Sequence, residues 1–401
     1  MKKLLMALLS VLLVTGIACE QKQTITKLEV GRNKLLGSDL VIEAITALQD
    51  AEIEEGNKTE PRALLLIAYT HAIDIGDAKA QRRVDEYTRE RTRRLEDMDN
   101  AQMKVILGVL NKGQRVQDSA RRVLVDKGIG AVPLLVESVV KRHYVNLRES
   151  VLLDMLHEIG STALPEVIKA IGDANTPATA RQDLVRLVGR IGDANAVADL
   201  ESSRNSSDAA LSMEINAALY KLGKEEYKKE IVEGLGNSDV AVRRSATKAM
   251  QDLKDVPTAE IVKVLDDSDG QVRLYAVQAL KKFPDQNATD TFVQILKSDP
   301  DENVKGTAAE ALVAYANQGL GKGLARKLVD ELMSGEISLP KDRVRVVQLV
   351  TKEALRKQIQ AMPTDMRTDL EYNLDQYRQN TEQNPTVKGE LRRLLLALEA
   401  K

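Results

Sequence analysis

Apolar residues recur along the middle of the chain at the spacing of amphipathic helices. In several segments positions i, i+3, i+4 and i+7 are apolar, which is the pattern of a helix with one buried face. Two such stripes are Leu184, Leu187, Val188 and Ile191, and Val151, Met155 and Ile159. Gly160 and Gly192 directly follow these stripes, and glycine easily adopts the left-handed conformation that ends many helices. The pattern therefore predicts short helices that end at glycine.

The stripes belong to a repeat whose phrase is Val-Arg-x-x-Ala. Clear copies begin at Val242, Val272 and Val304, the last with lysine in place of arginine. Looser copies begin at Val116, Leu147, Ala180 and Met213. The phrase thus recurs about every 31 residues, and a second apolar helix follows each copy. One helical hairpin per repeat fits this period, so the expected fold is all-α.

These phrases resemble HEAT repeats, and more closely the short HEAT-like repeats first recognised in phycobilisome lyases. The resemblance covers about seven repeats, from Val116 to Gly335. It implies a right-handed α-solenoid of helical hairpins with helical caps at its ends. In that family an aspartate in one hairpin turn and a basic residue at the second position of the phrase form a ladder of polar contacts along the stack.

The basic position of this ladder is filled in five copies of the phrase. The residues are Arg148, Arg181, Arg243, Arg273 and Lys305. Gln117 and Glu214 stand at the same position in two other copies, so the ladder is expected to be interrupted at the Met213 repeat.

The flanks of the repeats are also helical by pattern. We assign residues 113–336 to the HEAT-like repeats and residues 28–112 to a divergent N-terminal helical region, which is weakly similar to a tetratricopeptide unit. Residues 337–401 form a C-terminal helical region, in which Val344-Arg345 begins one more irregular repeat. The final stripe of Leu391, Leu394, Leu395 and Leu398 is expected to cap the open end of the solenoid.

The first residues have the features of a bacterial export signal. Lys2 and Lys3 precede an apolar run over residues 4–14, and small residues lead to Cys19, the single cysteine of the chain. Residues 15–19 resemble a lipobox, although Gly16 stands where a large aliphatic residue is usual. The resemblance implies a signal peptide over residues 1–18, a lipidated Cys19, and a flexible leader over residues 19–27. Simple secretion with a free thiol at Cys19 is the alternative.

Composition narrows the possible partners. The 401 residues include 58 Lys and Arg against 60 Asp and Glu, a formal net charge of −2, whereas nucleic-acid-binding domains usually carry a basic excess. Aromatic residues make up 3% and there is no tryptophan, so platforms that stack single-stranded nucleic acid are not expected. One cysteine cannot form an intrachain disulfide or a cysteine-built metal site. We therefore expect neither a nucleic acid partner nor a metal or cofactor.

The sequence contains no motif that signals catalysis. Nucleophile elbows, paired metal-binding histidines and phosphate-binding glycine loops are missing from it. The expected function is a non-enzymatic, lipid-anchored scaffold of the bacterial cell envelope, which faces the periplasm or the exterior and binds other envelope proteins or peptides. A lyase or another enzyme with an unrecognised site, built on the same repeats, is the alternative.

The contact surface is expected on the second helix of each hairpin, because solenoids present an extended concave face. Polar positions of these helices are Glu166, Lys169, Glu230, Glu233, Glu260, Lys263, Asp290 and Gln294. Solvated helix surface is the alternative for each of these residues.

Overall fold

The computed structural model describes residues 26–37, 40–74, 83–111, 116–141, 149–204, 208–253 and 255–399. The predicted signal peptide, Cys19, most of the leader and Arg148 lie outside these ranges. Within them every regular element is a helix, and none of these helices is long and apolar enough to cross a membrane. The chain divides into two compact units, residues 1–180 and 181–401, so the division falls inside the predicted repeat region.

The first unit is built around one deeply buried helix, α4 (Thr59–Asp74), which packs against α3, α6, α7 and α8. Its helices, apart from short 3-10 turns, are α2 (Lys27–Gly37), α3 (Val41–Glu54), α4, α6 (Val84–Glu96), α7 (Asn100–Asn111), α8 (Gln117–Asp126), α9 (Val132–Lys141), α10 (Glu149–Ile159) and α11 (Leu164–Gly172). Tyr69 and Tyr87 are buried and lie 5.4 Å apart between ring centroids. This region therefore has a core of its own.

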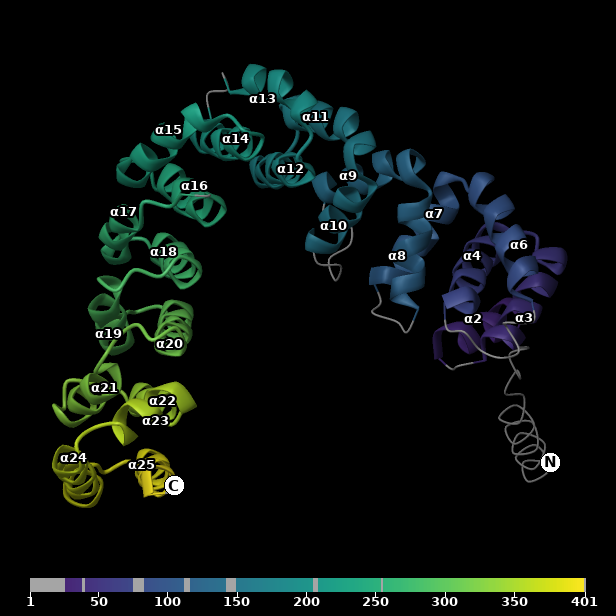
Figure 1. The fold of residues 1–401 in the computed structure, drawn as a ribbon. Coiled ribbons are helices and arrows are strands. Elements are labelled where there is room, and N and C mark those ends of the chain that lie inside the picture. The colour runs from purple at the N-terminus through teal and green to yellow at the C-terminus, as the bar shows by residue number, and fades with distance from the viewer. Residues whose placement is uncertain are drawn as a thin grey trace, which may run out of the picture. The chain divides into compact units, whose positions relative to one another are not determined.

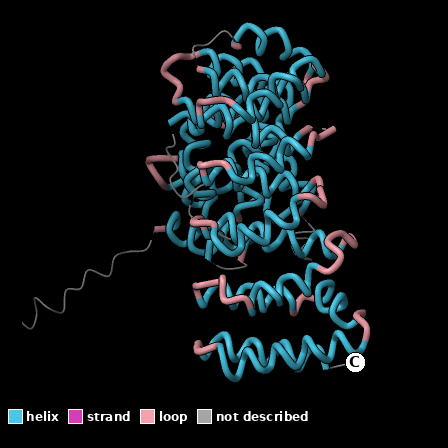
Figure 2. Tube along the Cα trace, turned by 90° about the vertical axis from the view of Figure 1, so that its left-hand side faces the viewer, coloured by secondary structure: helices cyan, strands magenta, loops and turns pink. Residues whose placement is uncertain are grey.

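The second unit is a stack of helical hairpins. Its helices are α12 (Ala178–Ile191), which begins just before the division, α13 (Val197–Ser203), α14 (Ala209–Lys221), α15 (Lys228–Glu233), α16 (Val240–Ala249), α17 (Thr258–Lys263), α18 (Gly270–Lys282), α19 (Ala288–Ser298), α20 (Glu302–Asn317), α21 (Leu324–Met333), α22 (Pro340–Val350), α23 (Glu353–Gln360), α24 (Thr364–Gln376) and α25 (Pro385–Glu399). Short connections join them, as the tube of Figure 2 shows.

The helices of the second unit form two layers (Figure 1). The inner layer contains α12, α14, α16, α18, α20, α22 and α25, on the inner side of this unit's curve. The outer layer contains α13, α15, α17, α19, α21 and α24. Within the inner layer α14 packs on α16, α16 on α18, and α18 on α20. The predicted all-α solenoid of helical hairpins is confirmed.

The repeat phrase has a direct structural role. Its valine and alanine are buried in all three clear copies, as Val242 with Ala246, Val272 with Ala276, and Val304 with Ala308. Small alanine side chains let neighbouring helices approach, while the valines fill the core between the layers. The aspartates before these helices, Asp239, Asp269 and Asp301, each accept a hydrogen bond from a backbone N–H of the first turn.

Candidate functional site

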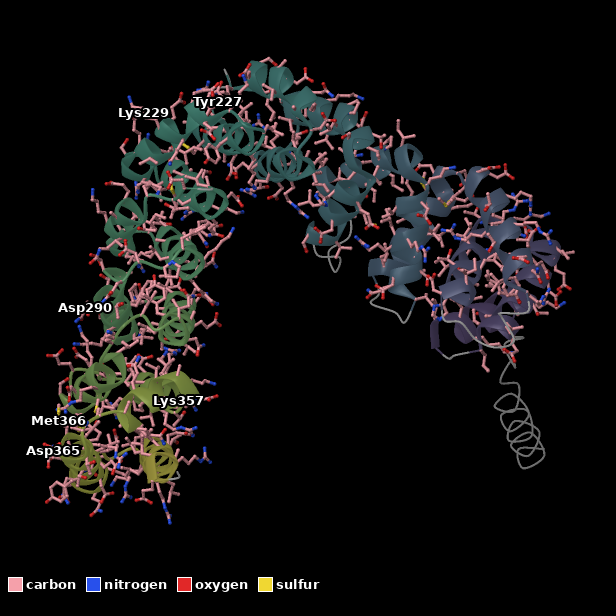
Figure 3. All side chains as sticks on the ribbon, viewed as in Figure 1. Tyr227, Lys229, Asp290, Lys357, Asp365 and Met366 are labelled. Atoms are coloured by element: carbon pink, nitrogen blue, oxygen red, sulfur yellow. The ribbon has the colours of Figure 1, made fainter. Side chains whose placement is uncertain are left out.

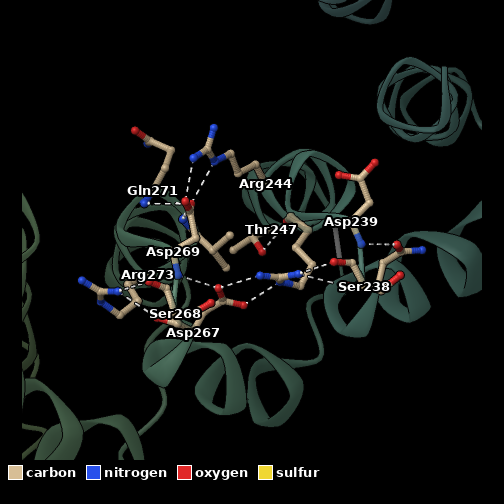
Figure 4. A network of polar contacts seen from close by, with 12 residues as sticks. Ser238, Asp239, Arg244, Thr247, Asp267, Ser268, Asp269, Gln271 and Arg273 are labelled. Carbon is tan, nitrogen blue, oxygen red and sulfur yellow. Dashed lines mark hydrogen bonds and ion pairs between the residues drawn. The ribbon is translucent and has the colours of Figure 1, made fainter.

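Ion pairs join successive hairpins of the second unit. Arg243 on α16 donates from Nε and Nη2 to the two carboxylate oxygens of Asp267 at 2.8 and 3.1 Å. Arg273 on α18 donates in the same way to Asp299 at 2.7 and 2.8 Å. The Nη1 of each arginine donates to two backbone carbonyls in the turn before its own helix (Figure 4). Each arginine therefore ties its own turn to the next one and holds two hairpins in register.

The same series continues toward the C-terminus with other partners. Lys305 on α20 donates to Asp342 at 2.5 Å, and both side chains are almost completely buried. Arg343 on α22 donates to both carboxylate oxygens of Glu382 at 2.8 and 3.1 Å. The phrase Val344-Arg345 placed the basic position two residues too late. Arg345 instead pairs with Asp342 and with Glu302 of the preceding hairpin.

A spacing signal in the sequence could have identified Arg343. Arg243 and Arg273 each stand four residues after the residue that precedes their helix, and Arg343 stands four residues after Leu339. The acidic partner stands two residues before the cap of the following helix. Glu382 has this position relative to Asn384, whose side-chain oxygen accepts the backbone N–H of Val387. The spacing from the helix cap is thus a better guide than the phrase itself.

The first repeats of the series depart from this geometry. The Nη2 atom of Arg181 lies 3.9 Å from a carboxylate oxygen of Asp208. The Nε atom of Arg181 is buried and has no hydrogen-bond partner. Arg148 falls outside the described residues. Glu214, where an interruption was expected, is buried and accepts two hydrogen bonds of 2.8 Å from Arg186 on α12, the first helix of the preceding hairpin. The acidic residue therefore bridges backwards, because its partner stands on the hairpin before it.

A close approach of two helices makes this bridge possible. An added Cβ at Gly189 on α12 would lie only 3.1 Å from the Cα of Ala218 on α14. Glycine at this position lets the two backbones come together, so that Arg186 and Glu214 meet across the gap. Arg186 also forms an ion pair with Asp183 of its own helix.

Two more residues of the inner layer extend this polar row. Lys248 on α16 has its Nζ 5.7 Å from the ring centroid of Tyr275 on α18. We call the five residues Asp183, Arg186, Glu214, Lys248 and Tyr275 the inner-layer site. They come from four successive helices of the inner layer, α12, α14, α16 and α18.

Lys248 differs from the other charged residues of this site. No carboxylate of the described residues lies within ion-pair distance of its ammonium group. Burial lowers the pKa of Lys248, and the nearby positive charge of Arg186 lowers it further. Burial likewise raises the pKa of Tyr275 and keeps its hydroxyl neutral. The ammonium group therefore has hydrogen-bond donors available to an added anion.

The charges around the inner-layer site are already paired. Lys221 lies 2.9 Å from Asp252, and Arg244 donates to both oxygens of Asp269 at 2.9 and 2.6 Å. The Arg244 guanidinium holds the pKa of Asp269 at about 2. These pairs frame Lys248 with groups whose charges are neutralised locally.

The contact residues predicted from the sequence lie elsewhere. In the second unit the second helices form the outer layer, and Figure 3 shows Asp290 on that outer side. Seven of the eight predicted residues take part in ion pairs: Glu166 with Lys169, Glu230 with Arg204, Glu233 with Lys229, Glu260 with Lys263, and Asp290 with Lys327. Gln294 is exposed. The described residues also contain no group of three or more His, Cys, Asp or Glu side chains that could hold a metal ion.

Comparison with known proteins identifies the repeats in part of the second unit. Residues 258–331 match the HEAT-repeat family. This match confirms that the chain carries HEAT repeats. No curated protein is significantly similar to the chain in sequence.

Solved structures with a similar arrangement of helices include a karyopherin. Kap121p bound to Nup53p is 12% identical with a TM-score of 0.46, over 95% of this chain and 48% of Kap121p. This chain thus spans about half the length of that protein. The complex of CpcE and CpcF of phycocyanin lyase from Nostoc sp. PCC7120 is 17% identical with a TM-score of 0.30, over 58% of this chain and 94% of that one. An engineered protein is 15% identical with a TM-score of 0.36, over 94% and 99%.

Proposed function

We propose that the protein is a membrane-tethered, non-enzymatic scaffold of the bacterial cell envelope, and that its inner-layer site binds an acidic segment of another envelope protein. HEAT repeats stack into solenoids that offer long binding surfaces. The observation that carries the proposal is Lys248, an ammonium group held partly out of water without a carboxylate partner. A glutamate or aspartate side chain of a bound segment supplies that partner.

Lys248 is a costly residue for the folded protein. Burial disfavours its charged form, and Arg186 adds repulsion, so the folded state is less stable than it would be with an apolar residue there. Its only described returns are the ring face of Tyr275 and attraction to carboxylates beyond ion-pair distance, and a position that lowers stability in this way is typical of a binding site. The carboxylate of a bound segment would gain a strong, charge-assisted hydrogen bond in a partly desolvated place.

The hydrogen-bond donors of Lys248 suit an acidic partner. Asp183 and Glu214 both contact Arg186 and also attract the Lys248 ammonium group, but neither forms an ion pair with it. Tyr275 adds a ring face beside the ammonium group and a neutral hydroxyl. An acidic segment with an apolar or aromatic neighbour therefore fits this part of the inner layer.

The cellular setting of this proposal comes from the sequence. The lipobox-like residues 15–19 support an export signal and lipid attachment at Cys19. A lipid anchor at Cys19 would hold both units beside a membrane that faces the periplasm or the exterior. The partners would then be envelope proteins or peptides.

The proposed binding is tested with a photo-crosslinking residue placed on each layer in intact cells. A crosslinker at Gln278, one turn after Tyr275 in the inner layer, should trap a protein, whereas one at exposed Lys229 in the outer layer should not (Figure 3). The adduct at Gln278 should disappear in Lys248→Met. Equal adducts at both positions, or an adduct that survives Lys248→Met, would exclude this site.

A binding measurement with a defined probe complements the crosslinking. A fluorescent peptide of alternating glutamate and leucine should bind the purified chain, and Lys248→Met should weaken that binding about tenfold, or about 1.4 kcal/mol. Lys229→Met is the matched control and should leave binding unchanged. Binding of a lysine-leucine peptide with equal strength would contradict the proposal.

A further inference from the structure

The last helix of the solenoid, α25, buries one apolar face and carries two leucines and two charged residues on a second, partly exposed face. Its buried face consists of Val387, Leu391, Leu394 and Leu398, and this face packs into the core. A second face consists of Arg392, Leu395, Leu396 and Glu399, which have the i, i+3, i+4, i+7 spacing of one helix side. Leu396 is 57% exposed, so the predicted cap leaves apolar surface of its own uncovered.

The second face of α25 lines a groove shared with α24. The groove has a volume of about 390 Å³, and α24 contributes Thr368, Glu371, Tyr372 and Asp375 at the same helical spacing. Tyr372 is 64% exposed at this groove. Leu396 lines the same groove from α25. The groove therefore combines two exposed, largely apolar side chains with charged residues around them.

We propose that a second copy of this chain covers the groove, with the two α25 helices packed antiparallel about a two-fold axis between Leu395 and Leu396. In such an arrangement Leu395 of one copy faces Leu396 of the other. Arg392 and Glu399 stand at equal distances from the axis, each about 5 Å along the helix at 1.5 Å per residue. Arg392 of each copy therefore faces Glu399 of the other.

The distribution of charge selects a second copy over a different helix. Within the described residues the ion pair of α25 joins Arg393 to Glu390, on another side of the helix, and leaves Arg392 and Glu399 at the groove. An acidic helix in this groove would meet Glu399, and a basic helix would meet Arg392. The other charged residues of the lining are already paired, Glu371 with Arg367 and Arg378 with Asp375. In the antiparallel dimer each Arg392 meets a Glu399, and this ion pair occurs twice because every contact of a two-fold interface occurs in duplicate.

The size of the surface sets the strength of the association. The 15 residues of α25 extend about 22 Å at 1.5 Å per residue. An interface made by two helices per copy lies at the small end of specific protein interfaces, so the dimer should be concentration-dependent. This association is separate from the inner-layer site, which lies on α12 to α18.

The test measures dimerisation of the purified full chain in detergent by sedimentation equilibrium over a range of concentrations. Arg392→Glu and Glu399→Arg should each weaken dimerisation at least tenfold, since each change places like charges opposite one another at two symmetric points. The double variant Arg392→Glu, Glu399→Arg restores both pairs and should return the dissociation constant to within about threefold of the original. Arg393→Glu, exposed and off the groove, is the matched control.

Leu396→Glu gives a second check that does not depend on the charges. This exposed position should tolerate glutamate without a change in the unfolding temperature, while dimerisation is lost. A chain that is monomeric throughout, a double variant as weak as the single variants, or a dimer that withstands Leu396→Glu would each overturn the proposal. Occupation of the groove by a helix of another protein would appear as a monomeric chain that binds that helix.

Discussion

Arg273 and Asp299 form a buried ion pair in which two guanidinium nitrogens meet two carboxylate oxygens at 2.7 and 2.8 Å. The side chains are 10% and 3% exposed. The backbone N–H of Asp301 donates to the same carboxylate, and the third nitrogen of Arg273 binds carbonyls of its own turn. Pairs of this kind need not stabilise a fold relative to apolar residues, but the loss of one member leaves a buried charge unsatisfied.

We predict that Arg273→Met lowers the free energy of unfolding by about 3 kcal/mol, because Asp299 then remains buried without its cation. Adding Asp299→Asn to Arg273→Met should recover part of this loss, since the amide is neutral and still accepts the N–H of Asp301. Urea unfolding followed by circular dichroism measures both effects.

Arg244→Met is the control for that prediction. Arg244 also forms a bidentate pair, with Asp269, but its side chain is 47% exposed, so its loss should cost less than 1 kcal/mol. Equal losses in the two single variants would show that burial does not govern these pairs.

Gly234 is a place where packing leaves no room for a side chain. An added Cβ would lie 2.5 Å from the Cε of Met213 and 2.9 Å from the Cβ of Ala246. Gly234→Ala should therefore lower stability by about 1 to 3 kcal/mol through overpacking. Gly236→Ala is the matched control, since no atom lies within 4 Å of its added Cβ and the substitution should be neutral or slightly stabilising. A Gly234→Ala variant as stable as the parent would mean that Met213 moves aside without cost.

The carboxyl of Asp269 should make stability depend on pH in the acid range. Arg244, together with the backbone N–H groups of Val272 and Gln271, lowers the pKa of Asp269 from its ordinary 3.8 to about 2 in the folded protein. A lowered folded pKa gives a stabilisation that is complete above about pH 4 and is lost as the pH falls toward 2. Arg244→Met should flatten this part of the profile of unfolding temperature against pH. A profile unchanged between these pH values would contradict the assignment.

The charge of Lys248 should lower the stability of the fold, whereas the charge of Asp269 raises it. The pKa of Lys248 in the folded protein lies below the ordinary 10.5, because burial disfavours the charged form. At neutral pH the amine is still charged, and this charge lowers the free energy of unfolding. Lys248→Met should therefore raise stability by up to about 1 kcal/mol at pH 7, and the gain should shrink as the pH approaches 10.5. A less stable Lys248→Met at pH 7 would indicate that the amine has a structural role.

The lipid anchor at Cys19 has its own test. Labelled palmitate should enter the original chain and not Cys19→Ser, and the variant should leave the membrane fraction. Two or more acyl chains give stable anchoring where one does not. A Cys19→Ser protein that fractionates with membranes as before would rule out the lipoprotein assignment.

The sequence by itself determined the helices and their repetition. Helical periodicity depends on residues three and four apart, and caps such as Asp239 and Asp269 act on the next turn, so both are visible locally. The period of about 31 residues repeats the same register in each hairpin, which is why Arg243 and Arg273 could be named before their partners were known. The phrase failed at Arg343 because Asp342, rather than valine, precedes this arginine, while a Val-Arg pair stands at residues 344 and 345.

Only the tertiary structure decided which layer faces inward and which charges remain without a partner. Arg186, Glu214, Lys248 and Tyr275 come from four hairpins, and their proximity depends on the small rotation between successive repeats and on the close helix contact at Gly189. The rotation between repeats and the helix contact are set by packing between hairpins, so no local sequence pattern reveals them. The same applies to α25, whose leucines at 394 and 395 look alike in sequence, although Leu394 is fully buried and Leu395 is only partly buried against the core and also lines the groove.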